Sequence, residues 1–421
     1  MTKKKQEGAF KVNKKEKVLF ELLKKYAFNV ISAPKGKLKY SFVEPGLAYH
    51  NTLWDWDSYW SIYSLNDIVE LLKNDKDFDY PYYRKLVNEA AKGDVLNFID
   101  FMESDGFTPI MLRCDVINDT YCSKENVKNS LKGYLIKSAL LACKLNNDYS
   151  FIDVNKLCLY LKYLKENQFD KKTGLFYYIS DIMIGADNNP TVFGRLYASS
   201  ADILFNSTMV DEYNSLIEIM KKKNLDYSFY ENERNNLIDS IYKHAFDKKD
   251  NIFYSQDINV KNNETEVFNK GLKPFWNSIP LKIEFFGCYA PFTFNFANKN
   301  DAKRAFKHLK NGGLLSKYGV RSLSKYEKMY NLEPSGNPSN WLGAIWGVSS
   351  YFIFKAYLNY GYKNKAKQIY KNTLNTYYKG ILENGSMSES YNPEDGKGIL
   401  HTMFFSFNML IASMKNELKN C

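Results

Sequence analysis

Two apolar segments near the carboxyl end most constrain how this chain can fold. Residues 341–358 (WLGAIWGVSSYFIFKAYL) and 403–414 (MFFSFNMLIASM) carry apolar or small side chains on nearly every helical face. A helix that is apolar all round must be enclosed by other elements. Between them, residues 363–379 place apolar side chains at i, i+3, i+4 and i+8 from Ala366, with lysines on the other face. This pattern is typical of a helix that covers an enclosed one.

The same alternation of enclosed and amphipathic helices is predicted upstream. Helices are expected at residues 58–72, 130–145, 153–166 and 196–209, and short hairpins at 174–179 and 251–256. Inner helices surrounded by outer ones predict an all-α chain built as an (α/α)6 barrel of six helical hairpins. A helical-repeat solenoid is the alternative, but the chain lacks the fixed period of about 30–45 residues that a solenoid needs. No Pro/Gly/Ser-rich linker divides the sequence, so a single domain over residues 1–421 is expected.

Charge and cysteine usage exclude several classes of function. The 58 Lys and Arg residues exceed the 47 Asp and Glu residues, but the lysines are scattered and accompany no nucleic-acid reader motif. The 6 cysteines form no CxxC pair and the chain has only 4 histidines, so no metal site is expected. No apolar stretch approaches the roughly 20 residues of a membrane span, and the first twenty residues are not a signal peptide. These features predict a cytoplasmic protein with no membrane or nucleic-acid partner.

The distinctive motifs stand in the loops that precede the predicted inner helices. They are LWDWDSYW at 53–60, GADNNP at 185–190, YGVRSLS at 318–324, NWLGAIWGVSSYF at 340–352 and SESYNPEDG at 388–396. If the inner helices run parallel, these loops meet at one end of the ring. Carboxylates, amides and tryptophans would then converge there, which is the composition expected of a carbohydrate site.

Together these motifs resemble the catalytic domain of glycoside hydrolase family 63 and, more distantly, the trehalases of family 37. The resemblance covers residues 53–409, and the chain length is similar to the bacterial branch that includes mannosylglycerate and glucosylglycerate hydrolases. It implies an (α/α)6 barrel, inversion at the anomeric carbon and no cofactor. The chain has Trp-Leu-Gly-Ala at 341–344 where the family usually has Trp-Arg-Gly-Pro, so the resemblance does not specify the substrate.

The resemblance assigns the two catalytic carboxylates. Asp187 of GADNNP matches the general acid, and Glu389 of SESYNP matches the general base. We expect them to face each other across one cleft, roughly 6.5–9.5 Å apart, as inversion requires. The alternatives are that Asp187 caps the following helix and that Glu389 is a surface carboxylate like Glu394 and Asp395.

Residues around these carboxylates are candidates for binding the sugar. In the family, the position of Asp57 binds hydroxyls of the sugar that is cleaved; the alternative is a helix N-cap. Tryptophans could stack on sugar rings or fill the core. Arg195 or Arg321 could bind an anionic aglycone or form a structural salt bridge, and Asp202 is interpreted as structural. The predicted substrate-binding residues are Trp54, Asp55, Asp57, Asn188, Arg195, Arg321, Trp341, Trp346 and Tyr391.

The sequence therefore predicts an inverting α-glycosidase. Its expected substrate is a small soluble α-glucoside or α-mannoside, glycosylglycerate-like or disaccharide-sized. Segments 260–280 and 323–340 are predicted to fold over the site as a lid. The alternatives are a trehalase or another sugar-processing enzyme on the same barrel, and a non-catalytic sugar-binding protein. The last should have lost one of the two carboxylates, and both are present.

Overall fold

Helices dominate the computed structural model, which describes residues 13–115, 128–263, 270–333 and 338–421. The α-helices are α1 (Lys14–Tyr26), α2 (Asp55–Leu72), α3 (Tyr80–Asp100), α4 (Leu135–Asn146), α5 (Val154–Asn167), α6 (Ile203–Lys222), α7 (Ser228–Ser240), α8 (Ala290–Thr293), α9 (Lys299–Asn311), α10 (Gly347–Asn359), α11 (Lys363–Asn384) and α12 (Leu410–Lys419). The chain is helix-rich, as its sequence predicts.

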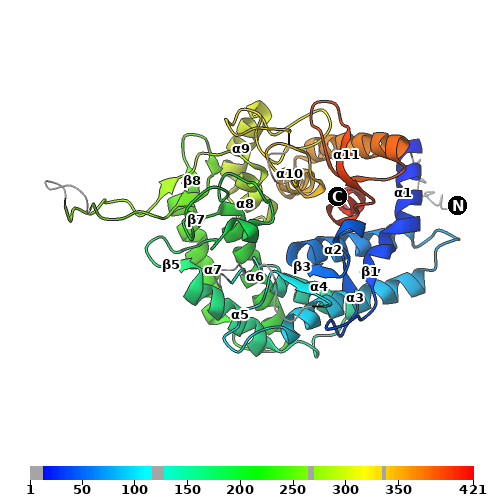
Figure 1. Cartoon of the computed structure of the whole chain (residues 1–421), viewed down its shortest axis with the longest axis horizontal. Helices are drawn as coiled ribbons and strands as arrows, with labels where there is room; N and C mark the ends of the chain where they lie inside the picture. The colour runs from blue at the N-terminus through cyan, green and yellow to red at the C-terminus, as the bar shows by residue number, and fades with distance from the viewer. Residues whose placement is uncertain (1–12, 116–127, 264–269, 334–337) are drawn as a thin grey trace, which may run out of the picture.

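An inner set of helices lies around the middle of the molecule (Figure 1). Along the chain, α2 contacts α4, α4 contacts α6, α6 contacts α8, α8 contacts α10, α10 contacts α12, and α12 contacts α2. Helix α10 is buried on every face over residues 347–354. The prediction that this apolar segment is enclosed by other helices is therefore confirmed.

The remaining helices lie outside this inner set. Helix α3 packs against α2 and α4, α7 packs against α6, and α11 packs against α10 and α12. Helix α11 buries Ala366, Ile369 and Tyr370, while Lys363 and Lys367 on its other face are exposed. Its amphipathic pattern thus predicts correctly which face meets the inner helices.

Several predicted helices begin later than expected. Helix α4 begins at Leu135 rather than at 130, because the preceding segment turns through Gly133 at φ 88°. Helix α10 begins at Gly347 rather than at 341, because Ile345 forms antiparallel bridges with both Arg321 and Tyr391. The segment from 403 first makes a 3-10 turn, Ser406–Met409, before α12. Long-range pairing overrides the local apolar pattern at these points.

The start of α6 shows why Asp202 is structural. The helix begins at Ile203, not near 196, and Asp202 is its N-cap. Its Oδ1 accepts the backbone N–H groups of Leu204 and Phe205, and its Oδ2 accepts the hydroxyls of Thr191 and Ser255. An N-cap carboxylate satisfies backbone donors that have no partner within the helix. The interpretation of Asp202 as structural is confirmed.

The strands are short and antiparallel. The two predicted hairpins correspond to β5 (Phe169–Asp170) with β6 (Leu175–Phe176), and β8 (Phe246–Asp247) with β9 (Ile252–Phe253). Two further pairs involve the candidate site. They are β3 (Thr52–Trp54) with β4 (Met111–Arg113), and β12 (Ser388–Tyr391) with β13 (Gly398–Thr402). The β3–β4 pair joins distant segments, so no local pattern predicts it.

The described residues of the predicted lid segment 260–280 do not fold over the site, and residues 264–269 of this segment lie outside the described part of the chain. Residues 258–263 and 270–278, which adjoin β10 (Gln256–Asp257) and β11 (Ile279–Pro280), project away from the helices (Figure 1), and Phe275 is 95 % exposed. β10 also pairs with β7 (Ser200–Ala201), which anchors the base of this projection. Among the described residues, no helix is both long and apolar enough to cross a membrane.

Candidate active site

One cavity of about 630 Å³ lies where the loops before α2, α4, α6, α10 and α12 meet. Its polar and aromatic lining includes Tyr49, His50, Trp54, Trp56, Asp57, Arg113, Lys132, Asp181, Asp187, Ser339, Trp341, Trp346, Glu389 and His401. Ser339 and Pro338 come from the segment 323–340, which thus supplies part of the wall. The structure brings together the two predicted catalytic carboxylates and several predicted tryptophans.

Glu389 lies on β12 and is buried, with 3 % of its surface exposed. The hydroxyl of Tyr49 donates a hydrogen bond of 2.9 Å to its Oε1. Burial raises the pKa of Glu389, while the Tyr49 hydrogen bond and the charge of His401 lower it. Its Oε2 is a buried acceptor without a hydrogen-bond partner among the described residues.

Asp187 lies in the loop between the 3-10 turn η3 (Asp181–Ile184) and α6. Gly185 begins this loop at φ 68°, and an added Cβ there would lie 3.0 Å from the Trp56 ring. The next residue along, Asn188, accepts the backbone N–H of Trp341 at 2.7 Å through its Oδ1. The charge of Asp187 raises the pKa of Glu389, so the two carboxylates interact across the cavity.

A third carboxylate, Asp57, lies in the first turn of α2 and lines the same cavity. It is not an N-cap, since Trp54 holds that position. The hydroxyl of Ser406 donates to its Oδ1 at 2.9 Å. Burial raises the pKa of Asp57 to about 7, although the charge of Lys132 lowers it. Asp57 can therefore both accept and donate hydrogen bonds to sugar hydroxyls near neutral pH.

Asp55 lies behind this lining and pairs with Lys132. The Lys132 ammonium contacts Asp55 Oδ1, and the Lys132 backbone N–H donates to Oδ2 at 3.1 Å. Both side chains are almost fully buried, at 2 % and 1 % exposure. The ammonium also lies 5.2 Å from the centre of the Trp56 ring. Asp55 thus fixes a cation in the cavity wall without lining the cavity itself.

The predicted tryptophans divide into two groups. Trp341 and Trp346 stack on each other with ring centres 4.1 Å apart, and both are nearly inaccessible, at 1 % and 2 % exposure. They form the packed floor of the cavity together with Trp56, whose ring centre lies 5.7 Å from that of Trp341. Trp54 is half-buried at the wall, and its indole N–H donates to Thr52. Of the predicted tryptophans, Trp54 is therefore the more accessible to a sugar ring.

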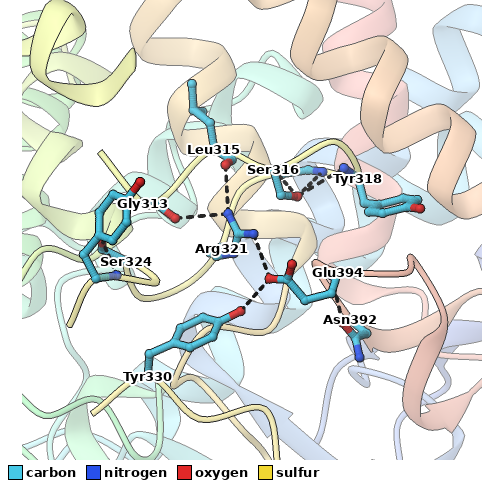
Figure 2. A network of polar contacts seen from close by, with 11 residues as sticks. Gly313, Leu315, Ser316, Tyr318, Arg321, Ser324, Tyr330, Asn392 and Glu394 are labelled. Carbon is cyan, nitrogen blue, oxygen red and sulfur yellow. Dashed lines mark hydrogen bonds and ion pairs between the residues drawn. The ribbon is translucent and has the colours of Figure 1, made fainter. Parts of the chain in front are cut away.

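Besides Asp55, four predicted binding residues lie outside the lining. Arg321 donates to the carbonyls of Gly313 and Leu315 and to Glu394 Oε1 (Figure 2). Arg195 pairs with Asp257 on β10. The predicted alternative of a structural salt bridge therefore describes both arginines.

The other two residues, Asn188 and Tyr391, hold the loops in place. Asn188 bonds the backbone of Trp341. The Tyr391 hydroxyl accepts the backbone N–H of Ser388 at 2.9 Å, and its ring packs against Tyr377. These contacts support the segments on either side of the two predicted catalytic carboxylates.

Sequence reasoning missed Tyr49, Lys132 and Ser406 as site residues. Tyr49 is one of 33 tyrosines, and nothing in its neighbourhood distinguishes it. Lys132 is one of many lysines, and Ser406 lies within an apolar segment. Only their positions in the fold reveal their contacts with Glu389, Asp55 and Asp57. No group of three or more metal-binding side chains occurs within the described part of the chain.

The fold and this cavity are those of a carbohydrate-cleaving enzyme. Residues 138–407 match the family model described as the mannosylglycerate hydrolase MGH1-like glycoside hydrolase domain, and the chain belongs to this family. It is therefore a glycoside hydrolase. The chain matches no curated protein sequence.

Solved structures share the fold at low sequence identity. The mannosylglycerate hydrolase of family GH63 from Thermus thermophilus, in complex with Tris and D-glycerate, is 13% identical, with a TM-score of 0.67. The match covers 93% of this chain and 99% of that one. Neutral trehalase Nth1 from Saccharomyces cerevisiae is 14% identical, with a TM-score of 0.59 over 91% of this chain and 74% of that one.

Proposed function

We propose that this glycoside hydrolase is an inverting α-glycosidase that hydrolyses a small α-glucoside or α-mannoside. Asp187 would act as the general acid and Glu389 as the general base. The observation that carries the proposal is that both carboxylates line one cavity and interact electrostatically. The cavity volume of about 630 Å³ suits a small ligand.

In the proposed reaction, one carboxyl group gives a proton and the other accepts one. Asp187 would protonate the glycosidic oxygen as the bond to the anomeric carbon breaks. Glu389 would remove a proton from a water molecule that attacks the opposite face of the sugar. Tyr49 supports this role, because its hydrogen bond to Oε1 holds the Glu389 carboxylate in place. Asp57 would bind hydroxyls of the sugar that is cleaved.

The proposal extends to the architecture. The unbroken series of contacts from α2 through α12 and back to α2 supports a closed (α/α)6 barrel formed by a single domain. The short α8 would be the inner helix of the fourth hairpin. A closed ring would hold the loops before the inner helices at one end, where the cavity lies.

A hydrolysis screen tests the proposal. α-Glucosides, α-mannosides, trehalose and glycosylglycerates would be incubated with the enzyme and followed by NMR. Cleavage of an α-glycoside should release the β-anomer first, because inversion places the attacking water on the opposite face. Release of the α-anomer would contradict inversion, and a lack of cleavage across the set would contradict the α-glycosidase assignment. Trehalose cleavage would select the trehalase alternative.

Replacing Tyr49 by phenylalanine should shift the pH dependence of the reaction. The Tyr49 hydrogen bond lowers the pKa of Glu389, so its loss should raise that pKa. If ionised Glu389 is the base, the acidic limb of the kcat/KM profile should move to higher pH. Tyr330→Phe is a matched control, because its hydroxyl donates to Glu394 outside the cavity. An acidic limb that moves equally in both variants, or in neither, would argue against Glu389 as the base.

A further inference from the structure

We infer that the leaving group of the substrate is neutral, and that a glycoside whose aglycone carries a carboxylate is disfavoured. This inference rests on the proposed function and specifies the substrate class of the same cavity. It differs from the sequence-based expectation of an anionic aglycone held by Arg195 or Arg321. The argument follows from how the positive charges around the cavity are paired.

Among the described residues of the lining, Lys132 and Arg113 each face a carboxylate. Lys132 pairs with buried Asp55. Arg113 donates to Asp115 from Nε and Nη2, at 3.1 and 3.0 Å, in a bidentate arrangement. A guanidinium held in this way has its planar fork occupied by a carboxylate of the chain itself. These two cations contribute little net positive charge to the cavity.

Of the two histidines in the described lining, His50 contacts a carboxylate and His401 lies near one. His50 contacts Glu44 Oε2 through Nδ1 at 2.6 Å. His401 faces Glu389, and its charge lowers the pKa of that carboxyl group. A proton on either imidazole would therefore lie near a carboxylate of the protein.

The arginines expected to bind an anion are both held outside the lining. Arg195 pairs with Asp257. Arg321 is buried, at 4 % exposure, and its guanidinium contacts Glu394 and two backbone carbonyls (Figure 2). Moving either one to a substrate would leave a carboxylate without its partner.

Acidic side chains, in contrast, outnumber the compensated cations in the lining. Asp57, Asp181, Asp187 and Glu389 all line the cavity. With Asp187 protonated as the acid, Asp57 partly neutral and Glu389 opposite His401, Asp181 still leaves the remaining charge negative. Moving an aglycone carboxylate out of water into such a cavity is costly unless a cation pairs with it. A polyol or a second sugar incurs no such cost.

Two isosteric substrate pairs test this inference. α-Mannosylglycerol and α-glucosylglycerol differ from the corresponding glycosylglycerates only in carrying CH₂OH in place of the carboxylate. We expect kcat/KM to be about tenfold or more higher for the neutral member of the pair that is cleaved. Equal or better cleavage of the glycosylglycerate would overturn the inference while leaving the glycosidase assignment intact.

Binding to the Asp187→Asn variant separates this inference from the proposed function. Titration calorimetry with each pair should show tighter binding of the neutral ligand, whether or not turnover occurs. If no member is hydrolysed by the wild-type enzyme but the neutral ligand binds more tightly, the inference stands and the proposed reaction fails. Failure of the neutral ligand to bind more tightly overturns the inference.

Asp115→Asn tests the role of the paired cation directly. Removing the carboxylate partner of Arg113 should leave a less compensated charge at the cavity wall. The ratio of anionic to neutral kcat/KM should then rise about two- to fivefold, as for a surface ion pair, and less at high salt. Asp100→Asn is the matched control, because Asp100 pairs with Lys39 away from the cavity. Equal ratios in the two variants would overturn the assignment to Arg113.

Discussion

Replacing Asp187 by asparagine is expected to lower kcat/KM on a natural α-glycoside by about 10²–10⁴-fold, the usual contribution of a general acid. Asparagine keeps the shape of the side chain but cannot protonate the leaving oxygen. A glycosyl fluoride needs little protonation, so its hydrolysis should be affected much less. The measurement is kcat/KM for both substrates in the wild type and the variant. Equal losses on the two substrates would contradict the acid role.

Glu389→Gln is the complementary variant. We expect a loss of similar size, but without recovery on the glycosyl fluoride, because the attacking water still lacks its base. Glu383→Gln is the control, since Glu383 lies nearby in the chain on the exposed end of α11. Recovery of Glu389→Gln on the fluoride would reverse the assigned roles, and near-normal rates in both variants would contradict the proposed mechanism.

Lys132→Met should lower the free energy of unfolding more than any other variant proposed for this protein. Removing one partner of a buried ion pair leaves the other charge without compensation, which costs about 3–5 kcal/mol. Lys132 and Asp55 are almost inaccessible, and Asp55 also accepts the backbone N–H groups of Trp56 and Lys132. The free energy of unfolding should be measured by chemical denaturation in the wild type and the variant.

Two further variants test whether the loss comes from the unpaired charge of Asp55 or from lost packing. Lys128→Met removes an exposed partner of Glu103 and should cost at most about 1 kcal/mol. Adding Asp55→Asn to Lys132→Met should recover part of the loss, because no buried charge remains without a partner. If Lys132→Met and Lys128→Met destabilise the protein equally, the buried pair does not have the role assigned here.

The sequence predicts which helices are enclosed by others, but it does not predict where those helices begin. Residues 347–354 are buried on every face, as their uniform apolar character predicts. Their upstream neighbours Trp341 and Trp346 share that character but precede the helix, because Ile345 pairs with Arg321 and Tyr391. Such bridges depend on segments distant in the chain, which no local periodicity reveals.

The candidate site was predictable where a motif combined several unusual residues. LWDWDSYW and GADNNP contribute Trp54, Asp57 and Asp187 to the lining, as their composition indicates. Tyr49 could not be singled out, because its role depends on one hydroxyl that meets Glu389 from another part of the chain. Arg195 and Arg321 were noticeable as rare arginines, but rarity does not reveal that Asp257 and Glu394 bind them.

The sequence by itself determined which segments must be enclosed and which loops carry carboxylates, amides and tryptophans. These properties depend on side-chain type and short-range spacing. The tertiary structure decided which of those side chains reach the cavity and which charges are already paired. Pairing depends on a few ångströms between groups up to hundreds of residues apart, as between Asp57 and Ser406. Such distances follow from how the helices pack, and that packing is a property of the whole chain.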